Sequence, residues 1–397
     1  MTGWRHPYLG HEVNRKNPVS FHFDGRPIEG FEGDTVASAL IASGIQIVGR
    51  SFKYHRPRGI VGFGAEEPNA LVDVTLNGKT TPNQRATLVS IRDGMDIRTV
   101  NASPDAGRDR FAVMDRFHRF IPAGFYYKTF MAFGWMFWEP MIRRMAGLGR
   151  LDPLNEPPAD IRAQNGDCDV LVIGAGPSGL AAALSASAAG KTVWLVDDGV
   201  QLGGGLRWRG GTIDGEHWSR FADEVQKSVQ EAGGRILSDT TLWGAFDQKM
   251  FAAWQRGADG SQIHWRIRAR ETILAAGAIE RPLWFADNDK PGVMSAEAAL
   301  YHLNCHGAMP GSDIVVATAN DLTYPVAAAL KEAGASVTLV DERSKVSPLE
   351  GIRQITNARV TAALGRNAVG GALVNGEYVS TDCILVSGGY TPSVHLW

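Results

Sequence analysis

The sequence predicts an α/β chain, in which an α+β N-terminal domain precedes a region built from two Rossmann-type βαβ units. Three observations lead to this class. A short apolar strand at 169–173 runs directly into a glycine turn, a helix and a second strand. A similar strand, helix and strand pattern recurs at 313–340. Before residue 100, short strands with turn dipeptides surround one capped helix.

The first βαβ unit carries the residue types that dinucleotide binding needs. Gly174 lets the chain turn sharply off the strand, Gly176 lets the backbone approach a pyrophosphate, and Gly179 permits close packing of helix on strand. The phosphates are expected at the helix N-terminus, where unpaired N–H groups and the helix dipole favour anions. The next strand, 192–196, leads to Asp197, which is spaced to accept a hydrogen bond from a ribose 2′-hydroxyl. An aspartate there favours NAD or FAD over NADP. The alternative is a glycine-rich turn without a ligand.

The N-terminal region, residues 1–100, predicts a ββα unit followed by further strands. The expected elements are strands at 19–23, 28–31, 70–76 and 87–91 and a helix at 36–42. The dipeptide Asn77-Gly78 predicts a hairpin after the third strand. This order is typical of a β-grasp or ferredoxin-like domain.

A connector is predicted over residues 101–165. Residues 105–149 look helical and aromatic, and 151–158 form a proline-rich linker. The aromatic segment 125–142 carries charges and a proline and is shorter than a membrane span requires. We expect it either to contribute to a subunit interface or to pack against the chain's own domains.

The region 166–397 is expected to be FAD/NAD(P)-binding-like, with a second unit at about 310–390. Its turn, 318–321, lacks the glycines of the first, so the fold is expected to persist with altered or lost binding. Segments 271–277 and 382–389 read as strands that return to the first and second sheets. In this architecture the first sheet still needs a further strand and helix beyond residue 397.

Composition limits the function classes. A net charge of −2 gives no hint of nucleic acid binding. The three cysteines, Cys168, Cys305 and Cys383, lie far apart, which excludes a disulfide framework and favours a reducing compartment. Residues 1–21 are polar and do not read as a signal peptide. A cytoplasmic protein is therefore expected, without nucleic acid or membrane partners.

Five separated segments together resemble the alpha subunit of heterotetrameric sarcosine oxidase. They are Arg50-Ser-Phe-Lys-Tyr-His-Arg-Pro-Arg-Gly59, Glu67-Pro-Asn-Ala-Leu71, Trp138-Glu-Pro-Met-Ile-Arg-Arg144, Ile279-Glu-Arg-Pro282 and Val386-Ser-Gly-Gly-Tyr-Thr-Pro392. The likeness covers essentially all 397 residues.

The resemblance implies a role within a complex. In that family, a beta subunit carries the FAD that oxidises sarcosine, and FMN at the interface of the alpha and beta subunits passes electrons to oxygen, giving hydrogen peroxide. Gamma and delta subunits complete the complex, and the one-carbon unit leaves as formaldehyde or is captured by tetrahydrofolate. The family's folate-binding domain has no counterpart in this sequence. No residue here is expected to be a catalytic acid, base or nucleophile.

The resemblance also assigns NAD to the first Rossmann unit. The cofactor-binding residues that it implies are Gly174, Ala175, Gly176, Pro177, Ser178, Gly179, Asp197, Asp198, Gly204, Gly205, Leu242 and Gly277.

No metal site is expected. Related dehydrogenase subunits hold a two-iron, two-sulfur cluster in the ferredoxin-like domain, but a cluster needs thiolates and residues 1–167 contain no cysteine. His302, Cys305 and His306 lie close in sequence, yet three residues on one short segment make a poor metal site. Together with His217, these histidines are expected on helix surfaces.

Two questions stay open at the level of sequence. The basic loop 50–58 either binds an FMN phosphate or an acidic partner, or is a solvated loop that pairs with Glu66 and Glu67. The chain itself is either the alpha subunit described above, an FAD-binding subunit of an opine or proline dehydrogenase type, or a non-catalytic nucleotide-binding scaffold.

Overall fold

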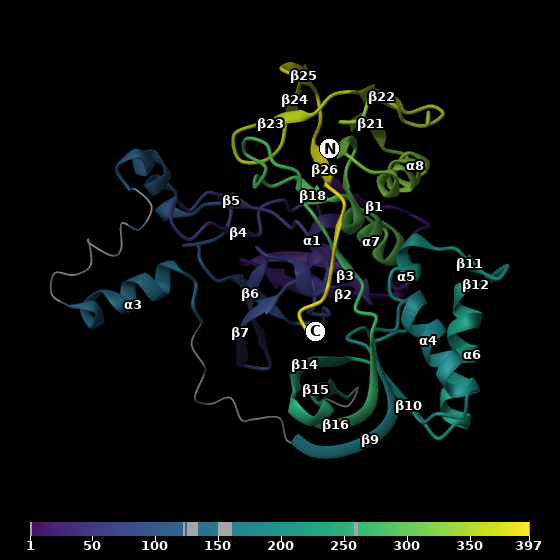
Figure 1. The fold of residues 1–397 in the computed structure, drawn as a ribbon. Coiled ribbons are helices and arrows are strands. Elements are labelled where there is room, and N and C mark those ends of the chain that lie inside the picture. Colours follow the sequence, from purple (N-terminus) through teal and green to yellow (C-terminus); the bar gives the residue numbers. More distant parts are fainter. Residues whose placement is uncertain (1, 122–123, 125–133, 150–160, 258–260, 397) are drawn as a thin grey trace. The chain divides into compact units, whose positions relative to one another are not determined.

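The computed structural model describes residues 2–121, 124, 134–149, 161–257 and 261–396. The chain divides into two compact units, which are described separately (Figure 1). The first comprises Met1–Asn155 with Glu280–Gly389, and the second comprises Glu156–Ile279 with Tyr390–Trp397. The predicted linker 151–158 and residues 125–133 of the predicted aromatic segment lie outside the described residues. The predicted mixed α/β class is confirmed.

The N-terminal part of the first unit forms the predicted ββα domain. Its five-stranded sheet has the order β3-β2-β8-β6-β7, in which only β2 and β8 are parallel neighbours. Phe21, Leu40 and Ile97 fill its core. Asn77 and Gly78 both have positive φ, so the predicted hairpin turn is confirmed. The elements are β2 (Asn14–Phe23), β3 (Arg26–Glu32), α1 (Val36–Ala42), β6 (Leu71–Leu76), β7 (Lys79–Arg85) and β8 (Asp96–Thr99).

The strand predicted at 87–91 is wrong. This segment is a turn with one isolated bridge between Ser90 and Thr35. The carbonyl of Val89 accepts from the N–H of Val36, and that of Ala86, just before the segment, accepts from the N–H of Ala37. The first N–H groups of a helix lack partners inside it, so this turn satisfies them.

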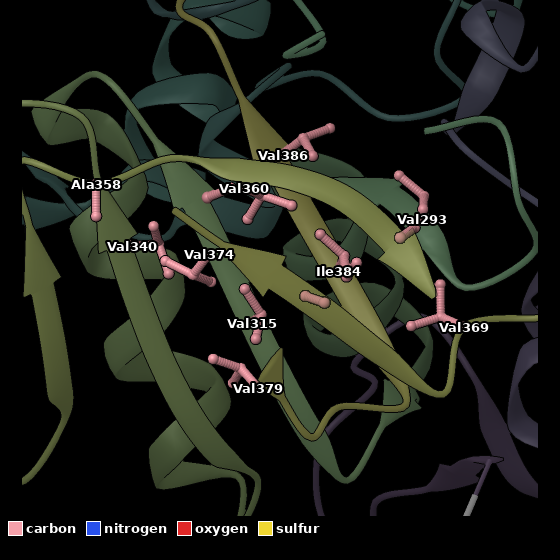
Figure 2. Close-up of a cluster of buried hydrophobic side chains, with 13 residues drawn as sticks. Val293, Val315, Val340, Ala358, Val360, Val369, Val374, Val379, Ile384 and Val386 are labelled. Atoms are coloured by element: carbon pink, nitrogen blue, oxygen red, sulfur yellow. The ribbon is translucent and has the colours of Figure 1, made fainter. Parts of the chain in front are cut away.

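The same unit contains the second Rossmann fold. Its parallel sheet has the order β18-β26-β20-β21-β22. Figure 2 shows side chains of this sheet, such as Val315 and Ile384, packed with Val360 and Val374 of a three-stranded antiparallel sheet. The elements are β18 (Val293–Ser295), α7 (Ala296–His306), β20 (Asp313–Thr318), η4 (Asp321–Thr323), α8 (Tyr324–Glu332), β21 (Ser336–Asp341), β22 (Arg353–Thr356), β23 (Val360–Leu364), β24 (Gly371–Val374), β25 (Glu377–Val379) and β26 (Cys383–Ser387).

The N-terminal segment fastens onto the end of α7. β1 (Thr2–Arg5) pairs with β19 (Ala308–Gly311). The backbone N–H of His11 donates to Asn304, and that of Glu12 donates to Cys305. The last carbonyls of a helix have no partner within it, so these bonds satisfy the end of α7 from a segment distant in sequence.

The first unit also contains short elements that belong to neither of these sheets. They are β4 (Gly49–Arg50), β5 (Pro57–Arg58), η1 (Gly64–Glu66), the 3-10 segment η2 (Arg110–Phe120) and α3 (Trp135–Met145). The last two lie in the stretch 105–149 that the sequence predicts as helical.

The second unit is the first Rossmann fold. Its sheet has the order β13-β10-β9-β16-β15-β14, with β13, β10, β9 and β16 parallel. Apolar side chains of α4 and α6, including Leu180 and Val225, pack on Leu195 of the sheet. The elements are β9 (Ile161–Ile173), α4 (Pro177–Ala188), β10 (Val193–Val196), α5 (Leu206–Arg209), β11 (Thr212–Ile213), β12 (Glu216–His217), α6 (Trp218–Glu231), β13 (Arg235–Leu237), β14 (Thr240–Phe246), η3 (Asp247–Lys249), β15 (Met250–Arg256) and β16 (Gln262–Leu274). β17 (Ala278–Glu280) and β27 (Tyr390–Pro392) form a separate two-stranded sheet.

In the part of the chain that the structure describes, no helix combines the length and the apolar character that crossing a bilayer requires.

Candidate nucleotide-binding site

Two of the three predicted turn glycines are required by the local packing. Gly174 has a φ of +100°, and a Cβ there would lie 2.3 Å from the carbonyl oxygen of Ala275. A Cβ on Gly179 would lie 1.8 Å from the carbonyl oxygen of Gly174. Both distances are far inside van der Waals contact with backbone atoms, so no larger residue fits either position without moving the chain.

Gly176 differs from its two neighbours in the motif. Its φ is −71°, which any residue adopts, and a Cβ built there meets nothing within 4 Å. The packing of the turn therefore does not require glycine. The backbone at this position is open at the start of α4, where N–H groups and the helix dipole favour an anion.

Asp197 ties the strand end to the glycine turn. Its Oδ2 accepts from the N–H of Ala175 at 2.5 Å, and its Oδ1 accepts from the N–H of Gly199 at 2.8 Å. Burial raises the pKa of Asp197 and the neighbouring Asp198 carboxylate adds to this, while the two backbone hydrogen bonds act in the opposite direction. Each carboxylate oxygen can accept a second hydrogen bond, so a ribose hydroxyl can be added to this arrangement.

A glycine-rich loop approaches the turn from the other side. The N–H of Gly203 donates to Ala175, and a Cβ on Gly204 would lie 2.8 Å from the Cα of Gly176. Gly205 follows as the cap of α5. The structure thus brings the predicted loop residues against the predicted turn.

The remaining predicted residues are distributed around this turn. Pro177 and Ser178 begin α4 and are exposed, and Asp198, which follows the end of β10, is exposed as well. Leu242 lies in β14 and is buried in the core, and the first residue of this strand, Thr240, donates its N–H to the carbonyl of Asp197. Gly277, with a φ of +71°, accepts from the N–H of Ser393. Their roles in nucleotide binding stay predictions.

The basic loop 50–58 is paired within the chain. Arg50 is buried and donates to the carbonyls of Ala106 and His55. Arg56 pairs with Asp115 at 2.7 Å and Arg58 with Asp289 at 2.5 Å. Glu67, a predicted partner of this loop, accepts instead from the backbone N–H groups of Val61, Gly62, Asn69 and Ala70. The loop is a folded substructure whose three arginines have acceptors within the chain.

His55 and Asp109 hold this loop together. The Nδ1 of His55 lies 2.7 Å from Oδ2 of Asp109, and both side chains are fully buried. Oδ1 of Asp109 accepts from the N–H groups of Ser103 and Phe111, so this carboxylate also caps η2. His55 itself has a φ of +53°, which an ordinary residue adopts only when its surroundings fix it.

We expect Asp109→Ala to lower the free energy of unfolding by about 2 kcal/mol, because it removes a cap and leaves a buried imidazole without its partner. Asp115→Ala is the matched control, since it breaks the Arg56 pair whose side chains are 38% and 44% exposed. That change should cost no more than about 1 kcal/mol. Urea denaturation of both variants measures the difference, and equal midpoints would contradict the assigned role of Asp109.

The expectation of surface histidines holds for one of the three. His217 is exposed and caps α6. The prediction is wrong for His302 and His306, because both are buried within α7. Burial lowers the pKa of His302 to about 4, and its Nε2 contacts the carbonyl of Gly62 at 3.3 Å. The sequence does not indicate the burial of His302, because its partner Gly62 lies 240 residues away.

Comparison with known proteins shows what the chain is similar to. Residues 16–102 match the family described as 2Fe-2S iron-sulfur cluster binding domain, and residues 169–266 match FAD dependent oxidoreductase. The sarcosine oxidase alpha subunit of Rhizobium meliloti (strain 1021) is 42% identical, with 100% of this chain and 42% of that protein covered. The protein of the same name from Corynebacterium sp. (strain U-96) is 33% identical over 98% of this chain and 39% of its own length.

The predicted resemblance to sarcosine oxidase alpha subunits is confirmed over the whole chain. The chain spans about two-fifths of the length of these curated relatives. An opine oxidase subunit of Agrobacterium tumefaciens (strain Ach5) is 33% identical over 46% of the chain and 38% of that protein. The solved structure of L-proline dehydrogenase from P. horikoshii has a TM-score of 0.64 at 22% identity, covering 98% of this chain and 63% of that one. At that identity the likeness shows the fold alone.

The donor atoms of the chain decide between the two cofactors that the family matches imply. An iron–sulfur cluster is held by thiolates, and residues 16–102 contain no cysteine. The ferredoxin-like domain therefore keeps the fold without residues that fit a cluster. The glycine turn of the first Rossmann fold, with Gly176 open and Asp197 beside it, does fit a dinucleotide.

Proposed function

We propose that the first Rossmann unit binds NAD and that the chain acts within a sarcosine oxidase-type complex. The observation that carries the proposal is the difference among the three glycines of the turn. Gly174 and Gly179 are needed for packing, but Gly176 has open space where its side chain would be. A glycine that the fold does not need is accounted for by a ligand that approaches its backbone.

In this proposal different residues of the site contact different parts of the dinucleotide. The turn from Gly174 to Gly179, with Ala175, Pro177 and Ser178, meets the pyrophosphate at the start of α4. Asp197 and Asp198 face the adenosine ribose, and an acid at that position disfavours the 2′-phosphate of NADP. The other contacts proposed are with Gly204, Gly205, Leu242 and Gly277.

The reaction proposed for the complex is the oxidative demethylation of sarcosine. Sarcosine, oxygen and water give glycine, formaldehyde and hydrogen peroxide, with methylene-tetrahydrofolate as the alternative one-carbon product. Flavins supply the hydride-accepting chemistry when bound, with FMN at the interface of this chain and FAD on a beta subunit. Gamma and delta subunits complete the proposed assembly. In this proposal the chain binds and positions cofactors and contributes no catalytic acid, base or nucleophile. The complex is proposed to lie in the cytoplasm.

A second candidate is an FAD-binding subunit of the opine or proline dehydrogenase type. The match of residues 169–266 to FAD dependent oxidoreductases and the likeness to the opine oxidase subunit favour it. In that case the same glycine turn holds the pyrophosphate of FAD. Because FAD and NAD share the adenosine and pyrophosphate groups, the turn and Asp197 serve either one.

The released nucleotide tests the proposal. We would denature the purified chain, alone and after co-expression with a candidate beta subunit, and identify the released nucleotide by absorbance and mass spectrometry. NAD from the chain alone, with FMN and sarcosine-dependent peroxide only in the complex, is expected. FAD released from the isolated chain would favour the second candidate, and a chain that binds neither nucleotide would contradict both.

Replacing Gly176 by alanine is expected to weaken nucleotide binding without loss of stability. The new methyl group has room in the free chain. It projects where the pyrophosphate approaches, so we expect the affinity to fall at least about tenfold, or about 1.4 kcal/mol. Isothermal titration with NAD, together with a thermal melt of the nucleotide-free chain, measures both effects. Unchanged affinity would move the ligand away from this turn.

A further inference from the structure

The two Rossmann folds can be aligned by strand register alone. In the first, Ile173 lies opposite Val196, so Gly174 and Asp197 follow at the strand ends. In the second, Thr318 lies opposite Asp341. Asp341 therefore occupies the position of Asp197. Two residues beyond each aspartate, a backbone N–H donates to its Oδ1, from Gly199 in one fold and from residue 343 in the other, both at 2.8 Å.

From this register, each turn glycine has a bulkier counterpart. Thr318 replaces Gly174, Asn320 replaces Gly176 and Thr323 replaces Gly179. The three side chains hydrogen-bond to one another. The Oγ1 of Thr318 donates to Oγ1 of Thr323 at 2.9 Å, and Thr323 lies 3.3 Å from Oδ1 of Asn320.

Asn320 also uses the groups that a phosphate would need. Its Oδ1 accepts from the N–H of Leu322 at 3.1 Å, an N–H near the start of α8. Its Nδ2 donates to the carbonyl and hydroxyl oxygens of Ser387, at 3.2 and 3.0 Å. The space and the donors that bind pyrophosphate in a glycine turn are thus taken by the chain's own side chain.

Arg343 closes the ribose end of the second fold. Its guanidinium donates to both carboxylate oxygens of Asp341, at 3.0 and 2.8 Å, and pairs with Asp321 of the turn at 2.8 Å. The hydroxyl of Tyr324 donates to Oδ2 of Asp341 at 3.0 Å. Asp341 is 1% exposed. Burial alone would raise the pKa of Asp341, but hydrogen bonds from Arg343 and Tyr324 outweigh it and hold that pKa below its usual value.

We infer that the second Rossmann unit is closed to NAD(H) and NADP(H) by Thr318, Asn320, Thr323 and Arg343, so the chain takes no hydride from a nicotinamide dinucleotide at this unit. Arg343 spans the turn and the strand end, which are the places of the pyrophosphate and the ribose in an open site. The inference deepens the proposed function and rests on it in one respect, because it limits dinucleotide binding to the first unit. In this respect the chain would differ from reductases that bind a hydride donor on a second Rossmann fold.

Equilibrium dialysis with NADH and with NADPH, each at about 1 mM, the upper end of ordinary KM values, tests the inference. The proteins are the whole chain and two variants, each checked by a thermal melt. Gly176→Val blocks the first turn. Leu322→Trp places an indole over the second turn, at the position that corresponds to Ser178; Leu322 is 57% exposed, so this change should not disturb folding.

We expect at most one equivalent of nucleotide per chain, lost in Gly176→Val and unchanged in Leu322→Trp. If Gly176→Val still binds some nucleotide, the double variant with Leu322→Trp shows where that nucleotide lies. Binding that survives in the double variant also supports the inference, because that nucleotide lies outside the turn 318–321. Residual binding that Leu322→Trp abolishes would overturn it. If the unaltered chain binds no nucleotide at all, the proposed function is contradicted, while the inference that the second Rossmann fold binds no dinucleotide is still supported.

Discussion

Replacing Gly179 by alanine is expected to lower the free energy of unfolding of the first Rossmann unit by about 3 kcal/mol or more. The added Cβ would lie 1.8 Å from the carbonyl oxygen of Gly174 and 3.3 Å from the Cβ of Ala275. The first neighbour is backbone at a strand end and has no rotamer that relieves the clash. Helix α4 would have to move off the sheet, which also opens the core around Leu180.

Gly176→Ala is the matched control, because the same methyl group three residues earlier meets nothing within 4 Å. Thermal melts of the two nucleotide-free variants should differ by about 10 °C. Equal melting temperatures would mean that α4 packs less closely on the turn than the structure indicates. A loss of NAD binding in both variants, with a loss of stability only in Gly179→Ala, would separate the two duties of the glycine motif.

The first Rossmann unit was predictable because its constraints are local. The positive φ of Gly174, the close approach at Gly179 and the placement of Asp197 all arise within about thirty residues. A glycine motif between two apolar strands leaves few alternative backbones. The second Rossmann fold was predictable from the same pattern of strand and helix, although the sequence did not indicate that Arg343 would pair with Asp341.

Interactions between distant segments were not predictable. Arg58 of the basic loop pairs with Asp289, more than 200 residues later, and His302 of α7 meets Gly62. The segment 87–91 has the residue pattern of a strand, yet the carbonyl of Val89 accepts a hydrogen bond from the start of α1. A single sequence carries no signal for such partners, because they depend on which elements the fold brings together.

Glu280 is a further example of a role that its motif did not reveal. The segment 279–282 marked the family, but the structure shows a glutamate that is 9% exposed. Its Oε2 accepts from the N–H of Glu297, at the start of α7, at 2.8 Å. Burial raises the pKa of Glu280 to about 7, and the nearby Glu297 carboxylate adds to the effect, while hydrogen bonds from Ser387 and Glu297 partly offset it.

This raised pKa makes the stability of the first unit depend on pH. An ordinary glutamate has a pKa of 4.5, so between about pH 4.5 and pH 7 the folded state holds a proton that the unfolded state has released. Stability from this group is therefore fully present below pH 4.5 and is lost as the pH rises through 7. The difference amounts to about 3 kcal/mol between pH 4.5 and pH 8.

Glu280→Gln is expected to remove this dependence. The amide oxygen can still accept from the N–H of Glu297, and no charge is buried at high pH. The variant should resemble the unaltered chain at pH 5 and exceed it in stability at pH 8, as measured by urea midpoints at both values. Glu332→Gln, an exposed position at the end of α8, serves as the control and should leave the difference between the two pH values unchanged. If Glu280→Gln keeps the full pH dependence of the unaltered chain, the charge that limits stability at pH 8 lies elsewhere in the first unit.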